Sequence, residues 1–372
     1  MPEREILKQE LMRDGFVILR NMIPPDELEE LRGSVDVILE KAAPHTRVIS
    51  TDYVDQQTAN VVEFFFDDRF FDVSRKLMDS IDAAPIGLLI LSAASTGWHR
   101  DLHPIDMAPL DGLQEDIRLN GPPYLQWNVA LEDDSFFHVV TGSHLRRNNE
   151  HENKIERRDG VVPLPGMKCV ELKAGDGVVY INAILHSAVP SGDTKRRTLI
   201  FGYLAFGGHA FTHFYPNATS GTQYVELLSS DAADRCRYFE ELHFQRIEEV
   251  AFVLRSILEK NEKDFASGLD RIHPSPLARM TTIVVLSKAA YLVRKFKNSN
   301  DPDDAHVEVL KPLSGKFTKD ELDQIWCRFA VLDRKLRSEE KQYIPLFQSG
   351  PMDYYFNEMP DWEVADFIAS WG

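Results

Sequence analysis

The hydrophobic and polar positions of the first forty residues predict a helix, a strand and a second helix. Apolar residues recur at helical spacing up to residue 11, Gly15 marks a turn, and residues 16–19 form a continuous apolar run. Prolines at positions 24 and 25 open the second helix. The apolar residues of this second helix share one face: Leu28, Leu31, Val35, Ile38 and Leu39.

The middle of the chain has the pattern of short β-strands. Runs rich in β-branched and aromatic residues occupy positions 124–131, 136–140, 177–181 and 198–206, with Gly, Pro, Asp and Asn between them. Residues 48–97 are mixed and end in the apolar run 86–91. Several short strands separated by turn residues predict an antiparallel sandwich or barrel, such as a jelly roll.

Helical patterns return after about residue 213, at positions 232–260, 277–297 and 318–340. The stretch 298–304, NSNDPDD, is the best candidate for a linker. The predicted fold class is therefore α+β, with a β core and N-terminal helices in residues 1–210. Residues 211–372 form a predicted helical extension that packs on the core or forms an interface, for which a homodimer is one expectation.

Composition narrows the function classes. The chain of 372 residues has 42 Lys+Arg against 59 Asp+Glu, which gives a formal net charge of −17. This balance argues against binding to nucleic acid or to an anionic membrane surface. The three cysteines lie far apart, the N-terminal segment MPEREILKQELMRDG contains no apolar signal-peptide core, and the longest apolar stretch is interrupted by Lys288. A cytoplasmic protein with a small-molecule substrate is expected.

A possible metal site begins with the sequence His99-Arg100-Asp101. On a strand, residues 99 and 101 point to the same side and can reach one ion. His186, which follows an apolar strand, would complete a triad of two histidines and one carboxylate that leaves three positions open on Fe(II).

The His-x-Asp pair alone is weak evidence in a chain with 12 histidines. A second pair, His306 and Glu308, follows the linker without a later histidine and is interpreted as surface. A zinc site at His99 and His103 is disfavoured because Pro104 directly follows, which is a poor setting for a helix.

Arg197 lies 11 residues after His186, at the start of the strand predicted over residues 198–206. An arginine at the mouth of an apolar strand needs a partner, and a planar guanidinium suits a carboxylate. The alternative is a solvated surface arginine. That alternative fits Arg196, because neighbouring residues on a strand face opposite sides.

Four blocks now resemble the phytanoyl-CoA dioxygenase family of Fe(II)/2-oxoglutarate-dependent oxygenases. They are GWHRD at 97–101, VVTGSHL at 139–145, AGDGVVYINAILHSA at 174–188 and RRTLIFGY at 196–203, and they occur in the family's order. The segment RDGFVILRNMIPPDELEELRGSVD resembles the family's opening. The resemblance covers roughly the first 210 residues. It departs at Thr141, where the family commonly has proline before Gly-Ser-His, and His144 is interpreted as part of that turn.

The resemblance implies a double-stranded β-helix in which His99, Asp101 and His186 are catalytic iron ligands. It also implies that Arg197 holds the distal carboxylate of 2-oxoglutarate, with O2 as the second cosubstrate. The expected reaction is oxidation of a small molecule, most simply hydroxylation, with decarboxylation of 2-oxoglutarate to succinate and CO2. A carboxylate at Asp101 favours hydroxylation, desaturation or ring formation over halogenation.

Several neighbouring residues are candidates for the substrate side. Gln126 and Asn128 alternate on the next strand and are predicted to bind cosubstrate or substrate. Residues 102–124 are predicted to be a loop that forms a lid, and Trp98 and Trp127 to shield the site. For Arg100, contact with a substrate anion and simple solvation both stay open.

Two other classes of function stay open at this stage. One is a non-catalytic β-sandwich that binds a small molecule, and the other is a cupin-like metalloenzyme that uses zinc or manganese without 2-oxoglutarate. The presence of the four residues His99, Asp101, His186 and Arg197 together favours the oxygenase.

Overall fold

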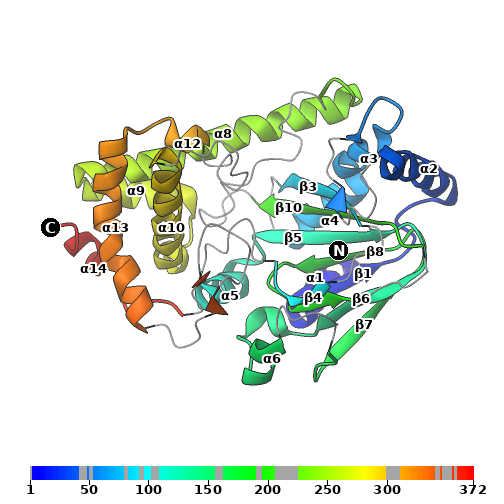
Figure 1. Ribbon diagram of the computed structural model, residues 1–372, viewed down its shortest axis with the longest axis horizontal. Helices are drawn as coiled ribbons and strands as arrows, with labels where there is room; N and C mark the ends of the chain where they lie inside the picture. Colours follow the sequence, from blue (N-terminus) through cyan, green and yellow to red (C-terminus); the bar gives the residue numbers. More distant parts are fainter. Residues whose placement is uncertain are drawn as a thin grey trace. The chain divides into compact units, whose positions relative to one another are not determined.

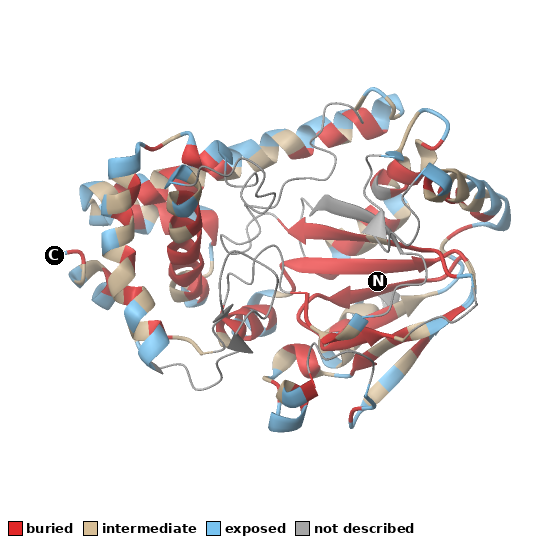
Figure 2. Cartoon of the chain, in the orientation of Figure 1, coloured by how far each residue is buried: buried red, intermediate tan, exposed pale blue. Residues whose placement is uncertain are grey.

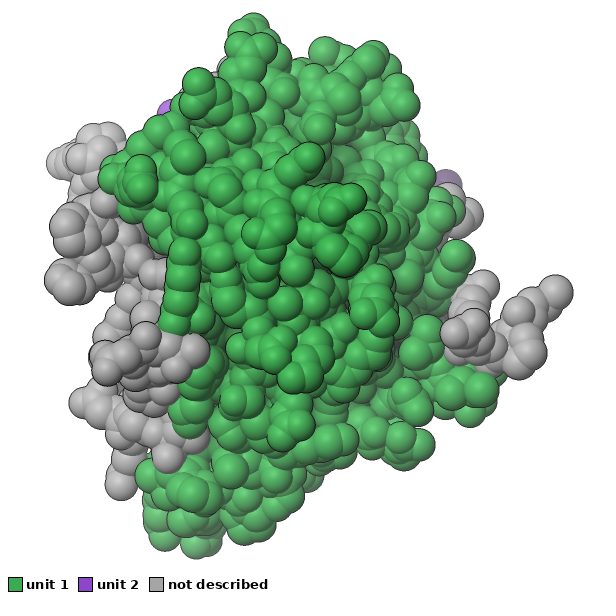
Figure 3. Space-filling view, turned by 90° about the vertical axis from the view of Figure 1, so that its right-hand side faces the viewer, with its two compact units in different colours: residues 1–101, 124–205, 217–240 green, residues 102–123, 206–216, 241–372 purple. Residues whose placement is uncertain are grey.

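The computed structural model gives the elements of Figure 1 and the burial of Figure 2 for most of the chain. It describes residues 2–41, 48–49, 53–78, 83–91, 96–101, 109–155, 162–189, 195–205, 225–298, 311–339, 344–345, 354–355 and 358–372. The chain divides into two compact units, coloured in Figure 3. Unit 1 contains Met1–Asp101, Tyr124–Ala205 and Asn217–Glu240, and unit 2 contains Leu102–Pro123, Phe206–Pro216 and Glu241–Gly372. This division assigns three segments, 102–123, 206–210 and 217–240, differently from the predicted boundary at residue 210.

Unit 1 contains two antiparallel sheets. The six-stranded sheet has the order β1 (Phe16–Leu19), β8 (Gly177–Ile181), β5 (Tyr124–Ala130), β10 (Thr198–Ala205), β3 (Ala83–Leu91), β2 (Val48–Ile49). The four-stranded sheet has the order β4 (Thr96–His99), β9 (His186–Ala188), β6 (Asp134–Val140), β7 (Met167–Leu172). The α+β class and the antiparallel strands predicted from the sequence are confirmed.

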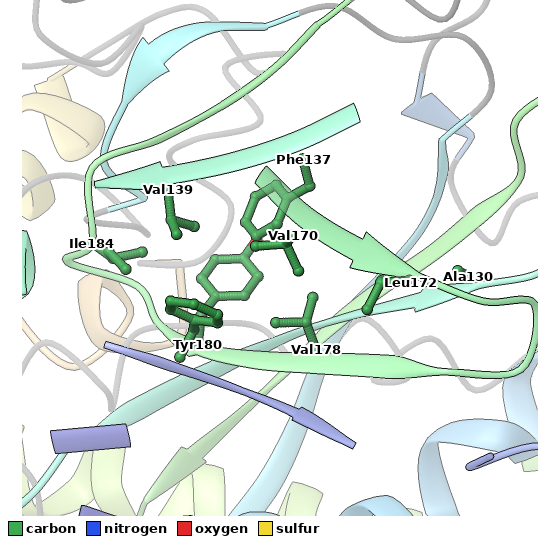
Figure 4. Close-up of a cluster of buried hydrophobic side chains, with 9 residues drawn as sticks. Ala130, Phe137, Val139, Val170, Leu172, Val178, Tyr180 and Ile184 are labelled. Atoms are coloured by element: carbon green, nitrogen blue, oxygen red, sulfur yellow. The ribbon is translucent and has the colours of Figure 1, made fainter. Parts of the chain in front are cut away.

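The two sheets face each other across an apolar core, shown in Figure 4. Val178 and Tyr180 of β8 pack there with Phe137 and Val139 of β6 and with Val170 of β7, each at most 3% exposed. Burying an apolar side chain of this size contributes about 1.5–3 kcal/mol relative to leaving it in water. The alternating inward residues of both sheets thus hold the sandwich together.

Helices cover the other face of the six-stranded sheet. Phe70 of α4 (Asp68–Met78) meets the rings of Trp127 and Phe201 edge to face, with centroids 5.1 and 5.4 Å apart. Strands β5, β8 and β10 are therefore buried almost throughout (Figure 2). The other helices of unit 1 are α1 (Pro2–Asp14), α2 (Pro25–Lys41), α3 (Asn60–Glu63), η2 (Phe64–Phe66), η3 (Ser143–Leu145), α6 (Glu150–Ile155) and the first turns of α8 (Ser230–Glu259).

Unit 2 is mainly helical. The rings of Tyr291 on α10 (Arg279–Asn298) and Trp326 on α13 (Lys319–Glu339) lie 5.3 Å apart. Among the described residues, one helix, Pro276–Asn298, has the length and composition of a membrane span, and 78% of its apolar window is buried inside the structure. The elements of unit 2 are α5 (Leu110–Asn120), the rest of α8, α9 (Glu262–Ile272), η5 (Pro276–Ala278), α10 (Arg279–Asn298), α12 (Lys311–Ser314), α13 (Lys319–Glu339), β11 (Ile344–Pro345), β12 (Tyr354–Tyr355) and α14 (Val364–Ala369).

The prediction of a loop over residues 102–124 is wrong for its second half, which forms α5. Leu110, Leu113 and Ile117 recur at helical spacing and are buried, which stabilises a helix there. Gly121, at φ 85°, ends it in a conformation that favours glycine. Residues 102–108, the other part of the proposed lid, lie outside the described residues.

Candidate metal centre

The pairing of β4 with β9 places two histidines side by side. His99, the last residue of β4, lies directly opposite His186, the first residue of β9, and their ring centroids are 4.2 Å apart. Asp101 follows two residues after His99, and its backbone N–H donates to the carbonyl of Asn182, 3.0 Å away. That bond ties the segment after β4 to the turn that leads into β9.

The carboxylate of Asp101 contacts Nε2 of both rings. Its Oδ1 is 3.4 Å from Nε2 of His99, and its Oδ2 is 3.2 Å from Nε2 of His186. Ligand atoms of the three residues lie within 4.8 Å of one another, the one such group found in the described part of the chain. Asp101 and His186 are buried, whereas the side chain of His99 is 17% exposed to solvent. The structure thus brings together the three residues that the sequence singled out.

The hydrogen bonds of both rings determine which nitrogen faces the aspartate. Nδ1 of His99 lies 2.8 Å from the carbonyl oxygen of Gly97, and Nδ1 of His186 lies 3.0 Å from that of Ile184. A carbonyl only accepts, so Nδ1 must carry the hydrogen in each ring. In the neutral rings, this leaves the Nε2 lone pairs available as ligands, as in many metal-bound histidines.

Burial and charge interactions set the protonation states of the site when no metal is bound. Burial would raise the pKa of Asp101, but attraction and hydrogen bonding to His186 and His99, in the forms that carry a proton on Nε2, outweigh it and hold that pKa well below its usual range. Burial lowers the pKa of His186, and the neighbouring His99 lowers it further. The site therefore offers a carboxylate and a neutral imidazole, the forms in which these groups bind metals.

The three residues fit a metal site. Ligand atoms bound to one ion at about 2.1 Å lie roughly 3 Å apart, close to the separations of 3.2 and 3.4 Å seen here. Two imidazoles and one carboxylate suit Fe(II), and the same donors also bind other divalent transition metals.

Polar residues of the six-stranded sheet extend the site. The ring of Tyr180 is 5.3 Å from that of His186, and its hydroxyl donates to Oδ1 of Asn128, 3.4 Å away. Gln126 lies directly opposite Tyr180 and accepts from the hydroxyl of Tyr124 at 3.1 Å. Burial raises the pKa of Tyr180 well above its usual value, so its hydroxyl stays protonated. The structure thus places the predicted Gln126 and Asn128 on the triad's side of the sheet.

The two adjacent arginines do not lie as the sequence predicted. Opposite residues of an antiparallel pair share a face, and β10 pairs Ile200 with Asn128 and Gly202 with Gln126. Alternation therefore puts Arg196 on the face of Asn128 and Arg197 on the helix-covered face.

The contacts of the arginines agree with this register. Nε of Arg196 donates to Oδ2 of Asp134 at 2.8 Å, and its charge reaches Tyr180, where it lowers the pKa of the hydroxyl against the effect of burial. Arg197 instead binds Glu132, Asp36 of α2 and the carbonyl of Arg32. Arg196 is buried, so its interpretation as a solvated residue is wrong, and the contacts of Arg197 do not group it with the triad.

The other sequence candidates fall in different places. Trp98 is buried and donates from its indole nitrogen to the carbonyl of Val162 at 2.7 Å, whereas Trp127 lies on the helix-covered face with Phe70. His103, His306 and Glu308 lie outside the described residues. Sequence reasoning missed Tyr180 and Asp134. Tyr180 could have been found from the alternation of β8, since it is the residue of that strand opposite Gln126.

His144 belongs to the turn at η3, as predicted, and it is fully buried. Its Nε2 lies 3.1 Å from the carbonyl oxygen of Met12, and its Nδ1 has no hydrogen-bond partner among the described residues. The nearby Gly15, at φ 88°, leaves room for the ring, because a Cβ there would be 2.6 Å from Nδ1.

We expect the stability of the protein to fall as the pH drops through the range set by His144. Burial lowers the pKa of this ring from 6.5 to about 4, so between those values the unfolded chain binds a proton that the folded chain does not. Lowering the pH from 8 to 5 should therefore reduce the free energy of unfolding by about 2 kcal/mol through this histidine. Urea unfolding at the two pH values measures this loss, and His144→Gln should reduce it. An equal loss in both proteins would contradict the assignment.

Comparisons with known proteins give structural matches only. No family model and no curated protein matches the chain. SnoN, described as a non-heme alpha ketoglutarate dependent epimerase from nogalamycin biosynthesis, is 20% identical over 59% of this chain and 91% of its own, with a TM-score of 0.41. HygX from Streptomyces hygroscopicus, solved with nickel and 2-oxoglutarate bound, is 18% identical over 55% of this chain and 87% of its own, with a TM-score of 0.42. EctD from S. alaskensis, solved with 2-oxoglutarate and 5-hydroxyectoine, is 16% identical over 54% of this chain and 76% of its own, with a TM-score of 0.41. At these values, the matches do not assign this chain to the family that its motifs resemble.

Proposed function

We propose that the protein is an Fe(II)- and 2-oxoglutarate-dependent oxygenase that acts on a small molecule, most simply by hydroxylation. The observation that supports this proposal is the convergence of His99, Asp101 and His186, each in the protonation state or tautomer that a metal ligand needs. In this interpretation the two facing sheets form the double-stranded β-helix of the phytanoyl-CoA dioxygenase family. The structural matches include iron- and 2-oxoglutarate-binding proteins, but the proposal depends on the site and not on them.

One set of residues binds the metal and shields it from water. His99, Asp101 and His186 hold the metal, and the charge of Asp101 offsets part of the charge of the ion. When bound, iron supplies the coordination positions for 2-oxoglutarate and O2 and the redox chemistry that couples decarboxylation to oxidation of the substrate. The buried rings of Phe137 and Tyr180 flank His186 at 5.5 and 5.3 Å and exclude water from that side.

A second set of residues binds the cosubstrate. Gln126, Asn128 and Tyr180 present polar groups on the face that also carries Arg196. A guanidinium on that face is suited to a carboxylate of 2-oxoglutarate, to which it can donate two parallel hydrogen bonds. We therefore assign the carboxylate-binding role to Arg196 in place of Arg197. Its contact with Asp134 holds the guanidinium on this face.

Replacing the two arginines in turn should separate their roles. Arg196→Ala should weaken 2-oxoglutarate binding by about 30-fold to several-thousand-fold, because loss of one partner of a buried charge pair costs about 2–5 kcal/mol. Arg197→Ala should leave cosubstrate affinity unchanged and lower stability by about 1–3 kcal/mol, since Glu132 and Asp36 lose the guanidinium that pairs with them. Titration of 2-oxoglutarate with saturating metal measures both affinities. The reverse result would return the role to Arg197.

The pairing of Arg196 with Asp134 also supports one alternative. If that ion pair is purely structural, the site is that of a cupin-like metalloenzyme that does not use 2-oxoglutarate. Such an enzyme, like a non-catalytic binding protein, would bind no 2-oxoglutarate and release no succinate. Screening of candidate substrates for succinate release under air therefore tests the proposed class and searches for the substrate at the same time.

A further inference from the structure

We infer that Arg100 is a positioning residue, which fixes the separation of Asp101 and His186 without touching the metal. Its neighbours in sequence, His99 and Asp101, are two of the three triad residues, and the alternation of an extended segment directs its side chain away from theirs. Arg100 is 0% exposed, so it is not a solvated residue. The inference rests on the metal centre of the proposed function.

The guanidinium of Arg100 donates to acceptors on two separate segments. Nη1 lies 2.8 Å from the carbonyl oxygen of Ser143 in η3 and also donates to the carbonyl of Ala183. Nη2 and Nε lie 2.6 and 3.2 Å from Oδ1 of Asn148. One buried side chain thus connects the segment of His99 and Asp101 to the turn at 142–148 and to the turn at 182–185.

The turn at 182–185 leads directly to His186, and it is bonded on each side of the Arg100 contact. The N–H of Asp101 donates to the carbonyl of Asn182, and the N–H of Leu185 donates to Oγ of Ser143 at 2.8 Å. Ala183, the acceptor for Arg100, lies between these two bonds in sequence. Any shift of the turn relative to Asp101 would therefore break the Arg100 contacts, which makes the distance between the two ligands depend on them.

The chemistry of arginine fits this role better than that of lysine. The acceptors around Arg100 are carbonyl and amide oxygens in different directions, and the planar guanidinium has five N–H donors in a fixed arrangement. A lysine ammonium at the end of a flexible chain cannot reach all of these acceptors with fixed geometry. Without the guanidinium, buried carbonyl groups lose their donor, and the two turns are free to relax.

Two substitutions of Arg100 and one matched control test the inference. Arg100→Met removes the donors, Arg100→Lys keeps the charge, and Arg146→Met breaks the ion pair with Glu152 on the same turn. The backbone carbonyl of Arg146 is unchanged in the control. At a temperature where circular dichroism shows each protein folded, both Arg100 variants should bind Fe(II) about 10- to 100-fold more weakly, as is typical when a partner behind metal ligands is lost. The control should bind normally.

Two further readouts separate positioning from a general loss of stability. With Co(II) in the site, the visible ligand-field spectrum should change in the Arg100 variants and not in the control. In the metal-free protein, hydrogen exchange of peptides covering residues 96–101 and 182–188 should accelerate in both Arg100 variants and not in the control. A normal spectrum and unchanged exchange in Arg100→Met would overturn the inference. If the unsubstituted protein binds no metal, the proposed function fails, whereas the exchange measurement still decides whether Arg100 holds the two segments.

Discussion

His186→Ala should abolish stoichiometric iron binding and all substrate-linked turnover. The imidazole of His186 is one of three ligands, its Nδ1 is held by the carbonyl of Ile184, and its Nε2 faces Asp101 at 3.2 Å. Alanine has no atom that can bind the metal. The other two triad residues are already ligands and cannot supply the missing third one. Isothermal titration of Fe(II) under anaerobic conditions and an assay of succinate release measure the two losses. His99→Ala should behave in the same way.

His138 provides a matched control for this prediction. It lies on β6 directly opposite Ser187, and its Nδ1 is 3.2 Å from the carbonyl oxygen of Phe136, the same local arrangement as in the two ligands. His138 is not part of the group that could hold a metal. His138→Ala should therefore keep iron affinity and turnover. Near-normal turnover in His186→Ala or His99→Ala would reject the triad.

Asp101→Ala should destroy oxidation of the substrate while the fold stays intact. The carboxylate contacts His99 and His186 and not the apolar core, so its removal leaves no cavity in the sandwich. Without metal, attraction and hydrogen bonding to His186 and His99 outweigh the desolvation of the carboxylate, so the variant should unfold at a somewhat lower temperature than the unsubstituted protein. Asp101→Asn, which keeps the shape and removes the charge, should give the same loss of turnover.

Calorimetry of the metal-free proteins and the succinate assay check the two parts of this prediction. A variant that folds normally and still oxidises substrate would show that Asp101 is not a ligand. The second His-x-acid pair, His306 and Glu308, would then have to be reconsidered as a metal site. A large loss of thermal stability would instead show that the carboxylate is needed for folding.

The sequence predicted those strands whose apolar pattern is continuous. Residues 177–181 were predicted as a strand and form β8, because five buried apolar or small residues follow one another. The short β9, His186–Ala188, has only three residues, and its formation depends on pairing with β4 and β6. Such a strand carries too little local pattern to be found without its partners.

The sequence predicted the positions of some site residues and not of others. The alternation of His99 and Asp101 and the position of His186 after an apolar strand indicated a possible triad, and the resemblance to a known family implied it. The structure brings the three residues together. The choice between Arg196 and Arg197 depends on the register of β10, and a shift of one residue exchanges the two faces of a strand. Spacing from His186 could not determine that register. The role of Arg100 depends on two distant turns and has no local signal in the sequence.

The most direct test of the proposed class is an anaerobic titration of 2-oxoglutarate into the protein loaded with Fe(II). Binding of both at one centre should produce a weak visible charge-transfer band that saturates at stoichiometric cosubstrate. The band should be absent from His186→Ala and present in His138→Ala. A protein that binds Fe(II) but gives no band at saturating 2-oxoglutarate would contradict the assignment of the cosubstrate, and one that binds no Fe(II) would contradict the metal centre itself.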